Sequence, residues 1–526
     1  MFLFKEKFNN WFSLRSWRPY FIIFTLGFLL YAQTLSYDLT YLDDNTLLID
    51  RYEIIKDIKN IPTVFSTDVF SSGANFFYRP FLNLSFMLDA QNGVDNFFIF
   101  HLDNIFLHII AVFLLFIVLK KILKNKNLAF FLSLIFLFHP VLTQAVAWLP
   151  GRNDSLVTIF ILASFLCLLS FSLRPRPISL LGYSIFFFIA LLTKETAIFF
   201  PFLVLIYLLT IGRRDYIFKS DRMLLVVTSF AAMFIWYLMR SYVFSQENIG
   251  IFAAGLSVFN NISGAFILGA KMILPFNLSV LPVPADSSLL LSFFAWPLLF
   301  IALFLSREKR WDYIIFGSAW FLMFFIPPFA ISSAAPFILE HRLYLPLIGF
   351  LIVISEIDWI KNLDFNKKNT RIICALILII LAALTLWHSA KFSNRLSFWK
   401  SAVSDSPHSP LAQKNMGAMY YLEGNSDLAL INYNKTLELS PNEPMVHNNI
   451  GLIYQERGNY GQAEKEYKNE LIMYPEYDKA LYNLGNLYYS QRRYDLAIPL
   501  FRAALNSNPY YYAAYQRLLN LDKTLR

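Results

Sequence analysis

Two adjacent carboxylates, Asp43 and Asp44, follow the first apolar segment of the chain. On its own, an Asp-Asp pair is most often part of a solvated loop, so its surroundings decide its meaning. The next segment has apolar residues at helical spacing, which predicts one helix lying in a membrane interface. These residues are Ile54, Ile58, Ile61 and Phe65. A loop pinned to the membrane surface in this way can hold a carboxylate over a lipid headgroup.

Ionisable residues recur in two later segments that separate apolar runs. His139 precedes a proline that ends its helix, and Arg152 and Asp154 follow in the same short segment. Lys194 and Glu195 stand between two apolar runs with almost no loop. Charges so close to hydrocarbon are costly unless they are used or paired. The dipeptide is therefore either part of a site or a mutual ion pair.

A fourth segment adds Glu340, His341, Arg342 and Tyr344, so acids and bases collect on one face of an apolar body. One chemistry needs this combination, namely transfer of a group from a lipid phosphate. A carboxylate removes the proton of an acceptor hydroxyl. Cations hold the phosphate and offset the charge that builds on it as it leaves.

The composition requires a membrane. Of 526 residues, 57% are hydrophobic and 15% are charged, and the mean hydropathy is +0.48, which excludes a purely soluble protein. The two cysteines lie in apolar runs, which excludes a disulfide framework and a thiolate metal cluster. Eleven apolar runs are long enough to predict membrane spans: 19–36, 97–119, 128–148, 154–173, 178–193, 196–211, 222–243, 288–305, 313–331, 343–360 and 371–390.

The net charge of +9 reflects membrane topology rather than nucleic-acid binding. With a cytoplasmic N-terminus, the cytoplasmic segments carry 21 Lys and Arg, and the outer segments before residue 391 carry nine. The stretch 250–285 is interrupted by polar residues and prolines, so we expect a helix and loop at one surface. The first span is expected to stay uncleaved.

The C-terminal part has a different composition and an internal repeat. Of the 55 Phe, only Phe501 lies after residue 400. Gly, Tyr, Ala, aromatic and Pro positions recur three times with a period of 34, the tetratricopeptide pattern. The pattern predicts repeats at about 410–443, 444–477 and 478–511 and a capping helix at 512–525. We predict an all-α chain: a polytopic membrane helix bundle over 1–390, with a catalytic first outer loop at 37–96, followed by an extracytoplasmic tetratricopeptide solenoid over 391–526.

The motifs of the chain resemble a known family, the transmembrane-and-tetratricopeptide O-mannosyltransferases and their bacterial relatives among the C-type glycosyltransferases. The matching stretches are Asp43-Asp44, Tyr78-Arg79-Pro80, Phe100 to Asn104 with His108, the His139–Asp154 block, Thr193-Lys194-Glu195 and Glu340 to Pro346. The chain departs from the family at Leu142 and Gln144, where relatives often have His and Glu.

The resemblance implies an inverting transfer of a sugar from a polyprenyl-phosphate donor to Ser or Thr hydroxyls of proteins outside the cytoplasm. It implies that Asp43 or Asp44 is the general base, and the two are not separable from sequence. Arg342, Arg152, Lys194 and Arg79 are the expected contacts of the donor phosphate. The expected supporting residues are His139, Asp154, Glu195, Glu340, His341 and Tyr344. We expect no cofactor, metal or nucleic acid. The acceptor protein is expected on the repeats.

Two alternatives stay open. One is an oligosaccharyltransferase that uses a lipid-pyrophosphate glycan. The other is a non-catalytic membrane scaffold for envelope or pilus assembly, in which the repeats recruit partners. A soluble nucleotide-sugar O-GlcNAc transferase is excluded, since nothing resembles a nucleotide-binding doubly wound domain. Residue usage favours a bacterial inner membrane, with the repeats in the periplasm.

Overall fold

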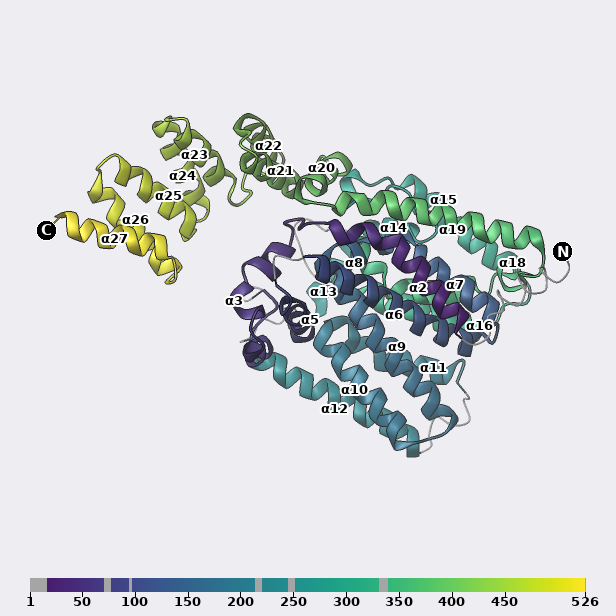
Figure 1. Cartoon of the computed structure of the whole chain (residues 1–526). Helices are drawn as coiled ribbons and strands as arrows, with labels where there is room; N and C mark the ends of the chain where they lie inside the picture. Colours follow the sequence, from purple (N-terminus) through teal and green to yellow (C-terminus); the bar gives the residue numbers. More distant parts are fainter. Residues whose placement is uncertain are drawn as a thin grey trace. The chain divides into compact units, whose positions relative to one another are not determined.

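The computed structural model describes residues 17–70, 77–93, 97–212, 220–244, 251–330 and 339–525, and the ordered elements in these ranges are all helices. The chain forms two compact units, which divide after Ser401. The sequence placed the boundary after residue 390, before the start of helix α20 (Arg395–Asp405). The expected fold class, a helical membrane bundle followed by tetratricopeptide repeats, is confirmed (Figure 1).

Each of the eleven predicted apolar runs contains a helix. These helices are α2 (Arg18–Tyr31), α6 (Phe97–Leu123), α7 (Lys126–Phe138), α9 (Arg152–Leu173), α10 (Pro177–Thr193), α11 (Phe200–Leu209), α12 (Ser220–Val243), α15 (Leu290–Leu305), α16 (Trp311–Phe325), α17 (Pro346–Ile354) and α19 (Lys368–Ser389). In the described part of the chain, six helical segments are long and apolar enough to cross a membrane. The count of eleven spans stays a prediction, because α10, α11, α15 and α17 are short.

One predicted span is broken. Helix α7 and the segment Pro140–Ala147, which ends in α8 (Thr143–Ala147), bend by 52° at His139. Pro140 cannot continue the helix, because it lacks an N–H and clashes with the preceding turn. The stretch 250–285 contains two helices, α13 (Ile251–Asn260) and α14 (Ile262–Ala270), followed by a loop, where the sequence predicted one helix and a loop.

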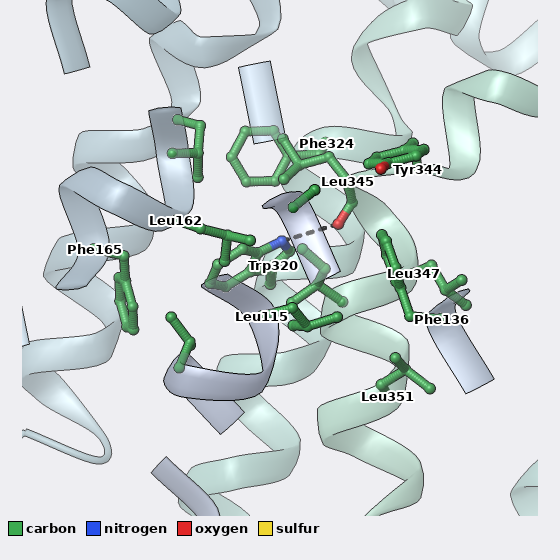
Figure 2. Packing of buried hydrophobic residues seen from close by; sticks show 14 of the residues in the cluster. Leu115, Phe136, Leu162, Phe165, Trp320, Phe324, Tyr344, Leu345, Leu347 and Leu351 are labelled. Carbon is green, nitrogen blue, oxygen red and sulfur yellow. Dashed lines mark hydrogen bonds between the residues drawn. The ribbon is translucent and has the colours of Figure 1, made fainter. Parts of the chain in front are cut away.

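The centre of the bundle is apolar and closely packed. Trp320 of α16 is fully buried, and its Nε1 donates a hydrogen bond of 3.0 Å to the carbonyl oxygen of Leu345 (Figure 2). Phe165 of α9 lies against Trp320 edge to face, with ring centroids 5.6 Å apart. The indole N–H thus has a partner, as a buried Trp requires, and α16 is fixed to the start of α17.

The segment between α2 and α6 folds around its own apolar core. That core includes Leu48, Ile55, Val64, Leu82 and Phe86. The expected single interface helix is wrong, since the chain forms three short pieces instead. They are α3 (Tyr52–Ile55), η3 (Ile58–Asn60) and α4 (Ile61–Ser66).

The physical reason lies in two residues. Asp57 is extended and accepts a hydrogen bond from Lys59 N, and Pro62 starts a new helix. Ile54, Ile61 and Phe65 therefore pack on the core of the loop rather than forming a lipid-facing stripe.

The second unit consists of stacked antiparallel helix pairs (Figure 1). They are α21 (Pro410–Leu422) with α22 (Ser426–Leu439), α23 (Val446–Glu456) with α24 (Tyr460–Met473), and α25 (Asp478–Ser490) with α26 (Tyr494–Ser507), followed by α27 (Tyr512–Leu525). A Cβ atom on Gly451 would lie 2.6 Å from the ring of Tyr467. Glycine at this repeated position therefore makes room for the aromatic ring of the paired helix.

The crossing of α16 and α17 depends on two glycines. A Cβ atom on Gly317 would lie 2.7 Å from the carbonyl oxygen of Gly349, and a Cβ atom on Gly349 would overlap the carbonyl oxygen of Gly317. We expect Gly349→Ala to destabilise the membrane unit by about 2 kcal/mol, because backbone atoms would have to separate. Thermal unfolding of the purified protein, followed by tryptophan fluorescence, measures this. Gly255→Ala is the matched control, since its Cβ atom meets open space, and equal stability of the two variants would contradict the expectation.

Candidate active site

Asp44 closes the loop that presents the acidic pair. The N–H and hydroxyl of Thr40 donate to Asp44 Oδ2 at 2.6 and 2.9 Å, and Asn45 N donates to Oδ1 at 3.0 Å. Tyr41 lies between Thr40 and Asp44 and has a φ of +61°. This left-handed conformation costs a non-glycine residue on the order of 1 kcal/mol. The three hydrogen bonds to Asp44 hold this strained turn in place. Burial raises the pKa of Asp44, and these hydrogen bonds act in the opposite direction.

The Asp43 carboxylate differs from that of its neighbour. It is half-buried, and it makes no hydrogen bond or ion pair with the residues that the structure describes. Burial, together with the charge of Asp44, raises the pKa of Asp43 to about 6, and the nearby Arg79 partly offsets the shift. Asp43 is therefore a carboxyl with unsatisfied acceptor capacity and a pKa close to neutral.

Two ion pairs lie at the same end of the bundle. Lys194 Nζ donates to Asp154 Oδ1 at 2.6 Å, which joins the end of α10 to the start of α9. Arg79 contacts Glu195 through Nε and Nη2, both 3.0 Å from Oε2. The adjacent Lys194 and Glu195 thus take different partners, and the mutual pair considered from sequence is not formed.

Arg342 belongs to the same electrostatic cluster. It is half-buried and interacts with Asp154, Lys194 and Arg79. Burial lowers the pKa of Arg342 to about 10, which leaves it charged at neutral pH.

The net charge of this cluster of ionisable side chains is positive. Three cations, Arg79, Lys194 and Arg342, face two carboxylates, Asp154 and Glu195. Burial and then these three cations lower the pKa of His341 well below its usual value, so the imidazole is neutral. The cluster therefore carries a surplus of one positive charge, beside Asp43.

Arg152 lies in a different, fully buried set. Its guanidinium pairs with Asp89 at 2.5 Å and donates to Asn104 Oδ1 and to the carbonyl of Phe100, both at 2.7 Å. It also stacks on Phe86, 4.6 Å from the ring centroid. The helix α5 (Pro80–Ala90) is thereby fixed to α6 and α9. The N–H donors of the Arg152 guanidinium are therefore occupied by groups of the protein itself.

Glu340 is the centre of a second buried network. Its Oε1 accepts from Lys271 Nζ at 2.7 Å and from Ser279 N at 3.1 Å, and its Oε2 lies 3.1 Å from His388 Nε2. Burial acts to raise the pKa of Glu340, but Lys271 and His388 outweigh it and lower the value to about 2. The network ties the loop after α14 and the turn η10 (Glu340–Leu343) to α19.

The remaining expected residues are buried among protein partners. His139 Nε2 lies 3.1 Å from the carbonyl oxygen of Met272, and Tyr344 Oη lies 2.6 Å from His108 Nδ1. Gln144, where the chain departs from the family pattern, accepts from His341 N and donates to the carbonyl of Val280, both at 3.3 Å. Of the predicted site residues, the structure brings together Asp43, Arg79, Asp154, Lys194, Glu195, His341 and Arg342.

Sequence reasoning missed Thr40, Asp89 and His388. Asp89 and His388 are ionisable residues at the ends of apolar runs, and that position is itself a signal of a paired or functional group. Thr40 carries no comparable signal, since its role depends on the backbone turn. Within the described ranges, no three His, Cys, Asp or Glu side chains form a group that could hold a metal ion.

Comparisons with known proteins agree with the two-part organisation. The dolichyl-phosphate-mannose-protein mannosyltransferase family model matches residues 82–239, and the tetratricopeptide repeat family model matches residues 448–512. The first of these ranges contains Arg152, Asp154 and Lys194, but neither Asp43 nor Arg342.

Three proteins similar to this chain are each named a protein O-mannosyl-transferase. Protein O-mannosyl-transferase F38B6.6 of Caenorhabditis elegans is 24% identical over 445 residues, which is 80% of this chain and 63% of that protein. Human TMTC2 is 36% identical over 27% of this chain and 17% of its own length. Mouse TMTC1 is 41% identical over 17% of this chain and 10% of its own length. The chain thus spans less than two thirds of the length of each of these relatives.

A solved structure, the first tetratricopeptide domain of Spaghetti bound to an HSP90 peptide, is 22% identical over 22% of this chain and 92% of its own, with a TM-score of 0.21. At that TM-score we draw nothing from the likeness.

Proposed function

Since the chain is a relative of the transmembrane and tetratricopeptide protein O-mannosyltransferases, we propose that it transfers one sugar from a polyprenyl-phosphate donor to protein Ser or Thr hydroxyls. The chain is a membrane protein, and the names of its relatives support membrane protein O-glycosylation. The observation that carries the proposal is the unbonded Asp43 carboxyl beside a cluster with a surplus positive charge.

Asp43 is our assignment for the general base. Its carboxylate has free acceptor capacity and a pKa raised to about 6, which suits a group that accepts a proton near neutral pH. Asp44 is a positioning residue, because its oxygens are occupied by Thr40 and Asn45. Asp44 acts by holding the turn that presents Asp43.

The proposed step breaks one bond and forms one at the anomeric carbon, and it moves one proton. The acceptor oxygen attacks the anomeric carbon while its proton moves to Asp43, and the bond from that carbon to the phosphate oxygen breaks with inversion. The lipid phosphate leaves with one more negative charge. Cations placed beforehand stabilise that charge most effectively, because they need not reorganise during the reaction.

Arg342, Lys194 and Arg79 are the proposed phosphate contacts. Arg342 ranks first because it is half-buried and lies in the positive cluster, between the acid Glu340 and Tyr344 along the chain. We reassign Arg152 to a structural role, since Asp89, Asn104 and Phe100 occupy its donors.

The proposed topology keeps the site outside the cytoplasm, in a bacterial inner membrane, with the repeats in the periplasm. Two rivals make different predictions. An oligosaccharyltransferase would add a glycan larger than a single hexose. A membrane scaffold would tolerate loss of Asp43. Glycopeptide mass spectrometry of envelope proteins, comparing cells that carry the wild type and Asp43→Asn, separates all three.

We expect Asp43→Asn to lower transfer by 10²- to 10⁴-fold, because the amide cannot accept the acceptor proton. Purified protein is assayed with polyprenyl-phosphate mannose and a Ser/Thr peptide, and product is measured by mass spectrometry. Asp50→Asn, an exposed carboxyl a few residues along the loop, is the control and should keep full activity. Wild-type rates in Asp43→Asn would remove Asp43 as the base.

The pH dependence of transfer should report the same group. Below about pH 6 Asp43 is protonated and inactive as a base, and above it the carboxylate is available, so kcat/KM should rise with pH and level off above about 7. A profile measured from pH 4.5 to 8 tests this. A rate that is flat across that range would contradict the assignment.

Two arginine variants should separate binding from structure. Arg342→Gln should raise the donor KM about tenfold or more with a small change in thermal stability, because a phosphate contact is lost. Arg152→Lys should lower the unfolding midpoint instead, because a point charge cannot replace the guanidinium contacts. Donor KM and thermal midpoint are measured for both. The assignment fails if Arg342→Gln leaves the donor KM unchanged.

A further inference from the structure

The segment that follows α19 contacts the loop that carries the acidic pair. Ser389 is the last residue of α19, and its hydroxyl oxygen lies 3.3 Å from Tyr37 Oη, although the two residues are 352 positions apart in the sequence. The carbonyl oxygen of Ser393 accepts a hydrogen bond of 2.9 Å from Asp38 N. The backbone just before the strained turn at Tyr41 is therefore fixed to a distant part of the chain.

Arg395 adds a contact with the turn itself. It is the first residue of α20, and its guanidinium carbon lies 5.4 Å from the ring centroid of Tyr41, which is within the range of a cation–π interaction. Both side chains are half-buried, so water screens the attraction only in part. Arg395 thus holds the side chain of the residue whose left-handed backbone presents the Asp43 carboxyl.

Helix α20 does not itself favour a cation at its first position. The N-terminus of a helix carries a partial positive charge, which favours acidic side chains there. Asn394 caps the helix, since its Oδ1 accepts a hydrogen bond of 2.9 Å from Ser397 N. The stability of α20 therefore does not account for an arginine at position 395, whereas the contact with Tyr41 does.

The same segment also contacts the turn that carries Arg342. His388 lies in the last turn of α19, and its Nε2 is 3.1 Å from Glu340 Oε2. Glu340 begins η10, the turn that contains Arg342. Phe392 is fully buried, with its ring centroid 5.5 Å from that of His388 and 5.7 Å from that of Phe398. One packed segment therefore contacts both the turn of the base and the turn of the phosphate-binding arginine.

The separation of these two turns matters for the proposed step. The base must reach the acceptor proton while the cations hold the donor phosphate, and a displacement of about 1 Å can lower the rate on the order of 10²-fold. The phosphate side has its own support, because Glu340 also pairs with Lys271. The turn at Tyr41 is held by Asp44 and by the segment after α19. Loss of the contact at Tyr41 therefore displaces the base and leaves the phosphate contacts in place.

We propose that Arg395 is a positioning residue for the transfer reaction, which orients the Asp43 carboxyl by holding the ring of Tyr41 from the segment after α19. The assignment of Asp43 as the base rests on the proposed function. Arg395 acts only through the turn and touches neither the sugar nor the phosphate. It therefore contributes to kcat and not to the affinity for the donor.

The first test is the kinetics of full-length variants in nanodiscs, with polyprenyl-phosphate mannose and a Ser/Thr peptide. Arg395→Ala should lower kcat at least about tenfold and leave the donor KM within about twofold of the wild type, because only the base is displaced. Lys400→Ala removes an exposed cation from the same helix and should keep the wild-type values. An unchanged kcat in Arg395→Ala overturns the proposal, as does a rise in donor KM that accounts for the whole loss.

The contact is also tested from its other side. Tyr41→Leu removes the ring, whereas Tyr41→Phe keeps a ring that attracts a cation. We expect the kcat of Tyr41→Phe to be at least about fivefold above that of Tyr41→Leu. The double variant Arg395→Ala plus Tyr41→Leu should be within about twofold of the slower single variant, because both changes remove the same contact. Losses that multiply would show two independent roles and would overturn the proposal.

A measurement without catalysis separates this inference from the proposed function. The N–H groups of Asp38, Thr40 and Asn45 all donate hydrogen bonds in or beside the turn. Hydrogen–deuterium exchange of a peptide that covers 37–47 therefore reports the order of the turn. Arg395→Ala should speed this exchange at least about tenfold, while exchange in α16 and the thermal midpoint stay close to those of Lys400→Ala.

Each outcome of the exchange experiment decides one question. Unchanged exchange at 37–47 shows that Arg395 does not hold the turn, and an equal rise in α16 shows a general loss of structure; either overturns the proposal. Faster exchange with wild-type kcat in an active enzyme also overturns it. If exchange is faster but the wild type transfers no sugar from any polyprenyl-phosphate donor, Arg395 still holds the turn and it is the proposed transferase activity that fails.

Discussion

The ion pair between Lys194 and Asp154 joins the ends of α10 and α9 at the edge of a largely apolar body. Removing one partner of a buried pair costs about 3–5 kcal/mol, since the other charge stays behind unpaired. The two helix ends must therefore remain together. Arg79 and Arg342 interact with the same carboxylate, so the first loop and the turn at 340–343 are drawn to this point. The remaining geometry of the site follows from this convergence.

The charged residues fall into two groups: those whose polar atoms have hydrogen-bond or ion-pair partners in the protein, and those whose polar atoms have none. Arg152 and Glu340 each contact several protein groups and are fully buried, so they connect segments that lie far apart in the sequence. Asp44 instead closes a local turn, because it accepts hydrogen bonds from Thr40, four residues before it. Asp43 differs, because its carboxyl is left with neither a hydrogen bond nor an ion pair in the described structure. Rigid surroundings and one unsatisfied carboxyl are the conditions that a general base needs.

The two units of the chain use different means to position polar groups. In the membrane unit, a charge is held by a counter-charge, because the apolar surroundings leave it no other stabilisation. In the repeat unit, the half-buried amide of Asn483 donates a hydrogen bond to the buried amide of Asn448. Strong, fixed charges suit a phosphate and its developing negative charge.

The sequence alone determined the helical fold class and the period of the repeats, because apolar run length and the 34-residue pattern are local properties. It also identified most of the charged residues at the site. Only the tertiary structure decided which of them meet. Lys194 pairs with Asp154 and not with the adjacent Glu195, and Arg152 pairs with Asp89. Which of Asp43 and Asp44 keeps free acceptors also depends on the turn at Tyr41. Charge pairing and hydrogen bonding depend on positions in space, and spacing along the chain does not specify them.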